Sequence, residues 1–148
     1  MAQHAEVRLA GGMTYLGRGA SNHWLAMDTK PESGGLDGAT RPVELLLIAL
    51  GGCTGMDVIS ILRKKKQNVT EFRIELMGQQ RDDNPKSYTS IELHFHVTGE
   101  EIDPAAVKRS IELSRDTFCS VAATLKPAVP LSYRYTIHSS QGEESYEL

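Results

Sequence analysis

The chain is 148 residues long, a length typical of one domain with one hydrophobic core. Hydrophobic residues make up 40% of it and charged residues 24%, as in an ordinary soluble globular protein. Nineteen acidic residues against 16 basic ones give a net charge of −3, which excludes a strong positive field for nucleic acid or an anionic membrane. We therefore expect a single domain over residues 1–148 with neither as a partner.

The N-terminal stretch MAQHAEVRLAGG carries Glu6 early and has no apolar run, so it does not resemble a secretory signal. Two cysteines do not make the disulfide framework of a small secreted domain. We therefore predict a cytoplasmic protein with two thiols.

The first segments with a strand pattern are Val7 to Leu9 and Met13 to Leu16, and Gly11-Gly12 between them suits a tight hairpin. Trp24 to Met27 is a third predicted strand. The stretch KPESGGLDGAT, residues 30–40, is rich in proline and glycine and predicts a loop.

The stretch LLLIALGGCTGMDVISIL, residues 45–62, predicts a long buried helix. It is about long enough to cross a membrane, but Asp57 would then lie in the hydrocarbon, where a charge is costly. Pro42 suits the first turn, with Thr40 or Arg41 as the cap. The cations of LRKKKQN suit the negative end of the helix, and Asn68 is expected to end it in a left-handed turn.

A helix that is apolar on every side must be covered on every side, and one small sheet covers one face only. Gly51, Gly52 and Gly55 fall on one flank of this helix, since successive residues turn by roughly 100°. A flank of glycines would let another helix approach closely. We therefore predict a homodimer with two such helices packed at its centre.

The rest of the chain alternates in the manner of antiparallel sheets and adds two helices. Residues 72–76 and 91–97 predict two strands joined by the turn-rich QQRDDNPKS. Asp103-Pro104 opens a helix that ends near Phe118, and Ser120 to Leu125 predicts a short third helix. Residues 131–137 predict the last strand, and the tail SSQGEESYEL is expected to be loose. The order βββ–α–ββ–αα–β indicates an α+β fold with antiparallel sheets.

The two cysteines are the first candidates for chemistry. Cys53 lies in the apolar helix, where an inert buried thiol is the plain alternative to a reactive one. Cys119 precedes Ser120, a plausible N-cap, and a thiol near a helix N-terminus has a lowered pKa. Their separation in sequence cannot say whether they meet, and it matches neither a zinc nor a thioredoxin motif.

His94 and His96 alternate on the polar face of a predicted strand together with Glu92, which is a spacing that metal ligands use. Because no third ligand is evident from the sequence, we expect a solvent-facing or interface strand and no metal. No glycine-rich phosphate loop and no serine nucleophile elbow is present, and we expect no bound cofactor.

RPVELLLIALGGCTGMDVISILRKK, followed far downstream by CSVAATL, resembles the OsmC/Ohr family of osmotically inducible protein C and organic hydroperoxide resistance proteins. The resemblance extends from GGMTYLGR to YRYTI and is strongest to the OsmC-like branch of unassigned function. It implies an OsmC-like α+β fold, with antiparallel sheets wrapped around long central helices in an intertwined homodimer. It also implies a thiol peroxidase for organic hydroperoxides that a dithiol, such as a lipoylated protein, reduces again.

Carried over to this chain, the resemblance makes Cys53 the attacking thiol and Cys119 the resolving one. An arginine and a glutamate assist in the family, and Arg18 in YLGRG is the candidate arginine. The best-known peroxidases carry glutamate directly after the helix-opening proline, whereas this chain has Val43 there and Glu44 one residue later. Asp57, one turn after Cys53, could take the role of the glutamate if an arginine pairs with it.

Three functions therefore stay open from the sequence. The first is a peroxidase that passes through a Cys53 sulfenic acid and a Cys53–Cys119 disulfide. The second is a non-enzymatic homodimer that binds a small apolar ligand at its interface. The third is a thiol redox sensor.

Overall fold

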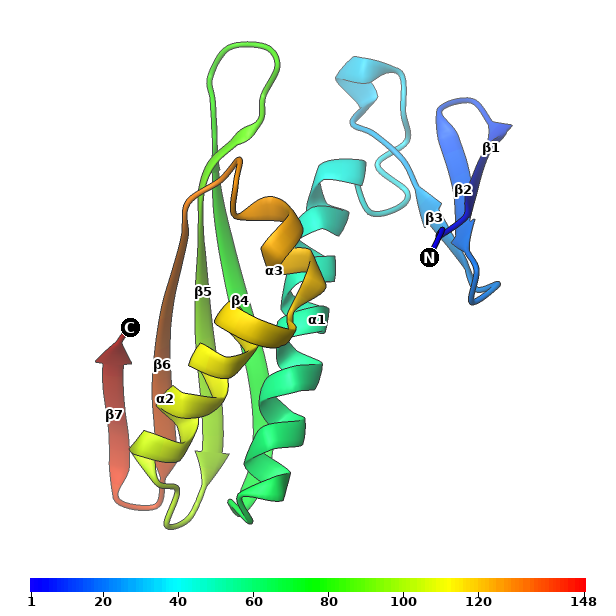
Figure 1. Cartoon of the computed structure of the whole chain (residues 1–148). Helices are drawn as coiled ribbons and strands as arrows, with labels where there is room; N and C mark the ends of the chain where they lie inside the picture. The colour runs from blue at the N-terminus through cyan, green and yellow to red at the C-terminus, as the bar shows by residue number, and fades with distance from the viewer. The chain divides into compact units, whose positions relative to one another are not determined.

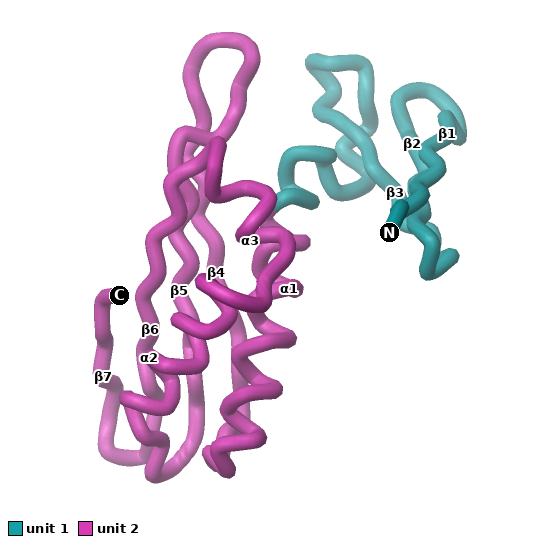
Figure 2. Tube along the Cα trace, in the orientation of Figure 1, with its two compact units in different colours: residues 1–46 teal, residues 47–148 magenta.

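The computed structural model describes residues 1–148, which form two compact units, residues 1–46 and residues 47–148 (Figure 2). The boundary falls inside the long helix, so each unit holds part of it. Both cysteines, Cys53 and Cys119, belong to the second unit.

The first unit holds a three-stranded antiparallel sheet of β1 (Ala5–Gly11), β2 (Thr14–Gly19) and β3 (Trp24–Met27), which confirms the three predicted strands. Gly12 turns the hairpin at a φ of 55°, a left-handed conformation that glycine adopts without strain. The loop after β3 contains a short 3₁₀ turn, Pro31–Ser33. It is organised by the buried Asp28, whose carboxylate accepts hydrogen bonds from the backbone N–H groups of Thr29, Leu36 and Gly38.

The long helix α1 spans Pro42–Lys64 and begins as the sequence predicts, with proline in its first turn. Arg41 is the capping residue, because its carbonyl accepts from the backbone N–H groups of Glu44 and Leu45. The predicted left-handed end at Asn68 is wrong: Lys66 takes that conformation, at a φ of 57°. Its neighbour Gln67 donates from the backbone to the carbonyl of Leu62, which closes the last turn two residues earlier than expected.

The second unit is built on a four-stranded sheet in the order β4 (Val69–Gln80), β5 (Tyr88–Gly99), β6 (Leu131–Ser139) and β7 (Gly142–Glu147). The α+β fold class is confirmed. The sheet is not wholly antiparallel as predicted, because β5 and β6 run parallel. A parallel pair needs a long crossover, and α2 (Pro104–Leu113), a π-helical turn (Ser114–Phe118) and α3 (Ser120–Leu125) provide it.

The C-terminal tail is not loose, as the sequence suggested, but forms strand β7 along the edge of β6 (Figure 1). Gly142 makes the tight turn possible with a φ of 129°, and Tyr146 stacks on Tyr135 with ring centroids 4.7 Å apart. Polar composition hid this strand, since one of its faces is solvated and its pairing partner is not visible in the sequence.

The core of the second unit lies between the sheet and the helices, and α1, α2 and α3 cover the same face of the sheet (Figure 1). Helix α1 contributes a stripe at intervals of four residues, Leu50, Thr54, Val58 and Leu62, all fully buried. By length and composition alone α1 could span a membrane. Its buried stripe makes it instead a core helix that packs on a sheet.

The glycines of α1 serve a different contact from the predicted one. A Cβ at Gly51 would lie 2.6 Å from Leu76 Cδ1, and one at Gly55 would lie 3.2 Å from Ile74 Cδ1. These two glycines therefore accommodate large side chains of β4 in the same chain, not a second helix. Gly52 has nothing within 4 Å of that position and stays available to another chain.

Candidate functional site

The middle of α1 and the start of α3 bring the two cysteines together. Cys53 is half-buried and Cys119 is buried, and both are free thiols. The two sulfur atoms and a carboxylate oxygen of Asp57 all lie within 4.8 Å of one another. Residues far apart in the sequence thus form one compact site, which the sequence alone could not establish.

Cys119 itself caps helix α3, in place of the predicted Ser120. Its Sγ accepts a hydrogen bond from the backbone N–H of Ala122 at 3.3 Å. Cys119 also caps the end of the preceding π-helical turn, because its backbone N–H donates to the carbonyl of Ser114. The sulfur also lies 3.3 Å from the hydroxyl oxygen of Thr54, which is part of the buried stripe of α1.

The expected low pKa of Cys119 is wrong. Burial raises the pKa of this thiol above its ordinary value, because the thiolate loses its hydration. The bonds from Thr54 and Ala122 act in the opposite direction but are the smaller effects, and neighbouring Cys53 raises the pKa further. Cys119 is therefore a protonated thiol at neutral pH, which suits a resolving group better than an attacking one.

Asp57 is held by Ser114, whose hydroxyl donates to its carboxylate at 2.9 Å. The catalytic role considered for Asp57 needs an arginine as its partner, but the ion pairs of the structure do not include Asp57. The π-helical turn begins at Ser114 and so places this hydroxyl against α1. The carboxylate stays an acceptor beside both thiols.

Tyr133 on β6 borders the same site and was not predicted from the sequence. Its hydroxyl is buried without a hydrogen-bond partner, and burial together with the nearby Cys119 raises its pKa to about 12. The guanidinium of Arg115 lies 5.8 Å from its ring centre and forms an ion pair with Asp116. In the sequence, the alternation of β6 makes Tyr133 look like an ordinary core residue. Only the folded position of Cys119 shows that Tyr133 lies at the site.

Thr54 and Ser114 were missed as well. Each looks like a small polar residue of a helix in the sequence, and nothing there predicts the contacts with Cys119 and Asp57. The adjacency of Thr54 to Cys53 was the one available signal.

The two remaining predicted residues lie in the first unit. Arg18 donates to the carboxylate of Glu6, at 2.7 Å for the shorter contact, and its guanidinium lies 4.5 Å from the ring centre of Trp24. Glu44 accepts from the backbone N–H of Arg41 at 2.9 Å and also pairs with the Arg41 guanidinium. Both therefore have structural partners of their own, and their assistance to Cys53 stays a prediction.

The site of Cys53, Asp57 and Cys119 combines donors that soft and borderline metals accept, namely two thiolates and one carboxylate. Loading a metal would require both thiols to ionise, and the raised pKa of Cys119 opposes this. A thiol pair beside an acceptor carboxylate is better suited to reversible disulfide chemistry.

The fold and the paired thiols define a class of α+β proteins with one cysteine on a long helix and a second at a helix start. A family model described as OsmC-like protein matches residues 34–134. Protein YhfA of Escherichia coli strain K12 is 41% identical over 133 residues, which cover 90% of this chain and 96% of YhfA. The chain belongs to the OsmC-like family.

Solved structures agree with this assignment. A hypothetical protein from Aquifex aeolicus VF5 has a TM-score of 0.81 at 31% identity, with 95% of this chain and 98% of that chain covered. An organic hydroperoxide resistance protein OsmC from Legionella pneumophila has a TM-score of 0.64 at 13% identity, with 93% and 96% covered. The latter likeness is one of fold alone.

Proposed function

We propose that this protein is a cytoplasmic, homodimeric, thiol-dependent peroxidase that reduces organic hydroperoxides, with Cys53 as the attacking thiol and Cys119 as the resolving one. The observation that carries the proposal is the meeting of two free thiols and a carboxylate within 4.8 Å. Membership of the OsmC-like family supports a redox role.

In the first step, the Cys53 thiolate attacks the terminal oxygen of the hydroperoxide ROOH. The O–O bond breaks, the alcohol ROH leaves after taking up a proton, and Cys53 becomes a sulfenic acid. Cys53 is the better attacker, since it is half-buried and reachable whereas Cys119 is buried and protonated.

In the second step, Cys119 Sγ attacks the sulfenic sulfur, a Cys53–Cys119 disulfide forms, and water leaves. The thiol of Cys119 must lose its proton as it attacks. The Asp57 carboxylate, held by Ser114, lies within 4.8 Å of both sulfurs and takes that role. A dithiol, of the lipoyl type that the family resemblance implies, then reduces the disulfide by two thiol exchanges.

The test is a single turnover with one equivalent of cumene hydroperoxide, read by mass spectrometry. Wild type should form the intramolecular disulfide, which a dithiol reopens. Cys53→Ser should not reduce the hydroperoxide. Cys119→Ser should attack the hydroperoxide once and leave a sulfenic acid that dimedone traps. Wild type that stays fully reduced would overturn the proposal. A disulfide that forms but supports no turnover with any dithiol would favour a redox sensor.

A second candidate, a non-enzymatic carrier of a small apolar ligand, rests on a pocket in the first unit. This pocket has a volume of about 470 Å³, within the range of small-molecule sites, and its lining is mainly apolar: Val7, Met13, Tyr15, Met27 and Pro42. Saturable binding of a fluorescent fatty acid that Met13→Glu abolishes and Cys53→Ser leaves intact would favour the carrier.

A further inference from the structure

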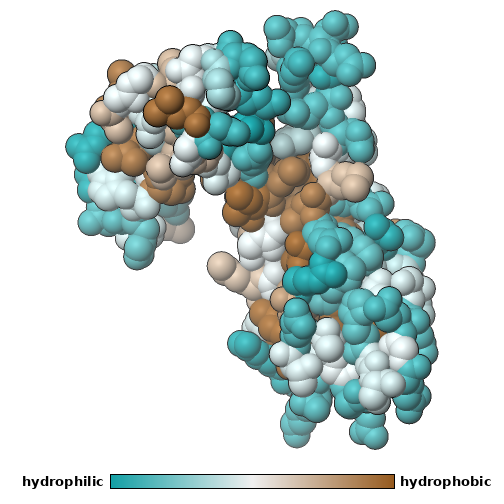
Figure 3. Space-filling view, turned by 180° about the vertical axis from the view of Figure 1, so that it is seen from behind, coloured by the Kyte–Doolittle hydropathy of each residue, from teal (hydrophilic) through white to brown (hydrophobic).

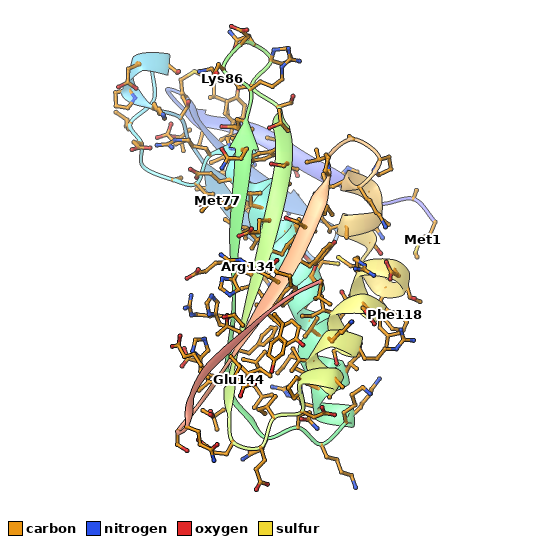
Figure 4. All side chains as sticks on the ribbon, turned by 90° about the vertical axis from the view of Figure 1, so that its left-hand side faces the viewer. Met1, Met77, Lys86, Phe118, Arg134 and Glu144 are labelled. Atoms are coloured by element: carbon orange, nitrogen blue, oxygen red, sulfur yellow. The ribbon has the colours of Figure 1, made fainter.

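The face of the four-stranded sheet that points away from the helices carries a group of ionisable side chains (Figure 4). On β5 they are His94 and His96, which alternate with the buried Phe95. Glu75 of β4 lies directly opposite His94 in the antiparallel register, which supplies the third ligand that the sequence did not reveal. This group is separate from the thiol site, since Cys53 and Cys119 lie on the side of the sheet that the helices cover.

The spacing of these three side chains fits a small metal ion. One ligand atom from each, a ring nitrogen or a carboxylate oxygen, lies within 4.8 Å of the other two. His96 Nε2 and Glu75 Oε2 are 3.4 Å apart. Tetrahedral Zn²⁺ with bonds of about 2.0 Å holds its ligand atoms about 3.3 Å apart. One pair is therefore already at about this spacing.

The hydrogen bonds of His96 leave its Nε2 free to bind a metal. That atom is buried and has no hydrogen-bond partner. His138 Nδ1 lies 2.9 Å from the Glu143 carboxylate, and His138 Nε2 lies 3.0 Å from His96 Nδ1. When His138 Nδ1–H donates to Glu143 and His138 Nε2 accepts from His96 Nδ1–H, the lone pair of His96 is on Nε2. In this tautomer, Nε2 and the Glu75 carboxylate are two electron donors that face each other with no proton between them.

His94 is oriented in a similar way. Its Nε2 lies 2.8 Å from the hydroxyl of Thr136, which in turn lies 2.8 Å from the hydroxyl of Ser145. When Nε2–H donates to Thr136, the lone pair of His94 is on Nδ1. Metal-binding histidines in proteins commonly donate their second N–H to such an outer partner.

The charge of the group also suits a metal. Glu75 forms an ion pair with Arg73, and its carboxylate brings a negative charge to the group. Arg73 binds Oε1 of that carboxylate and leaves Oε2 toward His96. Its charge repels a dication, but its side chain is 49% exposed, so water screens the repulsion.

We propose that Glu75, His94 and His96 bind one Zn²⁺ ion, with water as the fourth ligand. Two imidazoles and one carboxylate are ligands that Zn²⁺ accepts, and His138 and Thr136 are the outer partners that hold the rings. The ion bonds to both His96 Nε2 and the Glu75 carboxylate, so that these two electron donors no longer face each other without a partner.

Calorimetric titration of the chain with ZnCl₂ tests the proposal. The titration is made in a Cys53→Ser/Cys119→Ser background, so that no thiol competes for the metal. We expect one Zn²⁺ per chain, and a ¹⁵N shift of His96 Nε2 on binding. His96→Asn and Glu75→Gln should weaken binding by about 100-fold or more, and His138→Asn by about 10-fold.

Two further histidines of the chain, His4 and His23, lie outside the group and give matched controls, whose change to Asn should leave the affinity unchanged. Glu75 is 60% exposed, so Glu75→Gln keeps the test valid even if His96→Asn does not fold. The proposal fails if the thiol-free chain binds no Zn²⁺ saturably, or if Glu75→Gln binds as tightly as the parent. Because the background lacks both thiols, neither result depends on peroxidase activity.

Discussion

The reactivity of Cys119 results from two opposing influences of its neighbours. Burial favours the neutral thiol and raises the pKa, whereas the hydroxyl of Thr54 and the N–H of Ala122 favour the thiolate. The net effect is a thiol that ionises only at alkaline pH. The thiolate form destabilises the fold, so this contribution to stability is present below the ordinary thiol pKa and is lost as pH rises through the raised one.

Removal of the Thr54 hydroxyl should shift that balance further. In Thr54→Val the thiolate loses a donor, so the pKa of Cys119 should rise and the midpoint of its alkylation should move to higher pH. Thr54→Ser is the matched control and should keep the wild-type midpoint. Alkylation with iodoacetamide at a series of pH values, with the sites resolved by mass spectrometry, measures both. A midpoint in Thr54→Val that moves down, or not at all, contradicts this account.

Arg18 remains the candidate cation for Cys53. If it assists the attacking thiolate, Arg18→Ala should shift the alkylation of Cys53 to higher pH and slow the first turnover. Arg8 is the matched control, because its guanidinium also lies over the Trp24 ring, at 4.3 Å. Equal profiles for wild type, Arg18→Ala and Arg8→Ala would leave Arg18 with its structural contacts to Glu6 and Trp24.

At the scale of elements, the first turn of α1 gives Glu44 a structural role that is separable from a catalytic one. Its carboxylate accepts from the backbone N–H of Arg41, as in the second half of a capping box. Glu44→Ala should therefore lower the free energy of unfolding by about 0.5–1 kcal/mol, measured by urea denaturation.

Glu44→Gln separates the two roles, since an amide oxygen can still accept that bond. It should lose less stability than Glu44→Ala. If the charge assists catalysis, peroxide turnover should fall in both variants alike. Turnover in Glu44→Gln equal to that of wild type would show that the carboxylate only caps the helix.

At the scale of the whole molecule, the outstanding feature is the apolar surface that α1 and β4 leave uncovered (Figure 3). It forms a groove of about 570 Å³, lined mainly by Ile48, Met56, Ile59, Phe72, Ile74 and Leu76. Met56 is 74% exposed, which is costly for a large apolar side chain in a single chain. A second copy of the chain is the partner that we predicted from the sequence.

Sedimentation at micromolar concentration should therefore give about 33 kDa, twice the 16.3 kDa chain. A charge within the groove, as in Met56→Lys, should weaken the dimer by at least about 10-fold, because it has to be desolvated. Met77→Lys is the matched control. Met77 is also exposed, but it lies opposite Glu92 in the strand register and on the other face of β4, outside the groove. A well-folded wild-type monomer contradicts the homodimer.

Most of the local structure could be predicted from the sequence, with strand β7 and the end of α1 as the exceptions. Apolar residues at intervals of two and of four, together with Pro42, Asp103 and the glycines, predicted strands and helices. The stretch RPVELLLIALGGCTG indicated the family. These features depend on neighbours along the chain, which a sequence shows. The single domain over residues 1–148 stays a prediction.

Which side chains meet depends on the tertiary structure. The contact of Cys119 with Thr54, the bond from Ser114 to Asp57 and the position of Glu75 beside His94 all join distant segments. Such contacts depend on strand register and on how helices pack on the sheet. The pKa of Cys119 was predicted with the wrong sign for the same reason: its helix N-terminus is visible in the sequence, whereas the burial that outweighs it is a property of the packed fold.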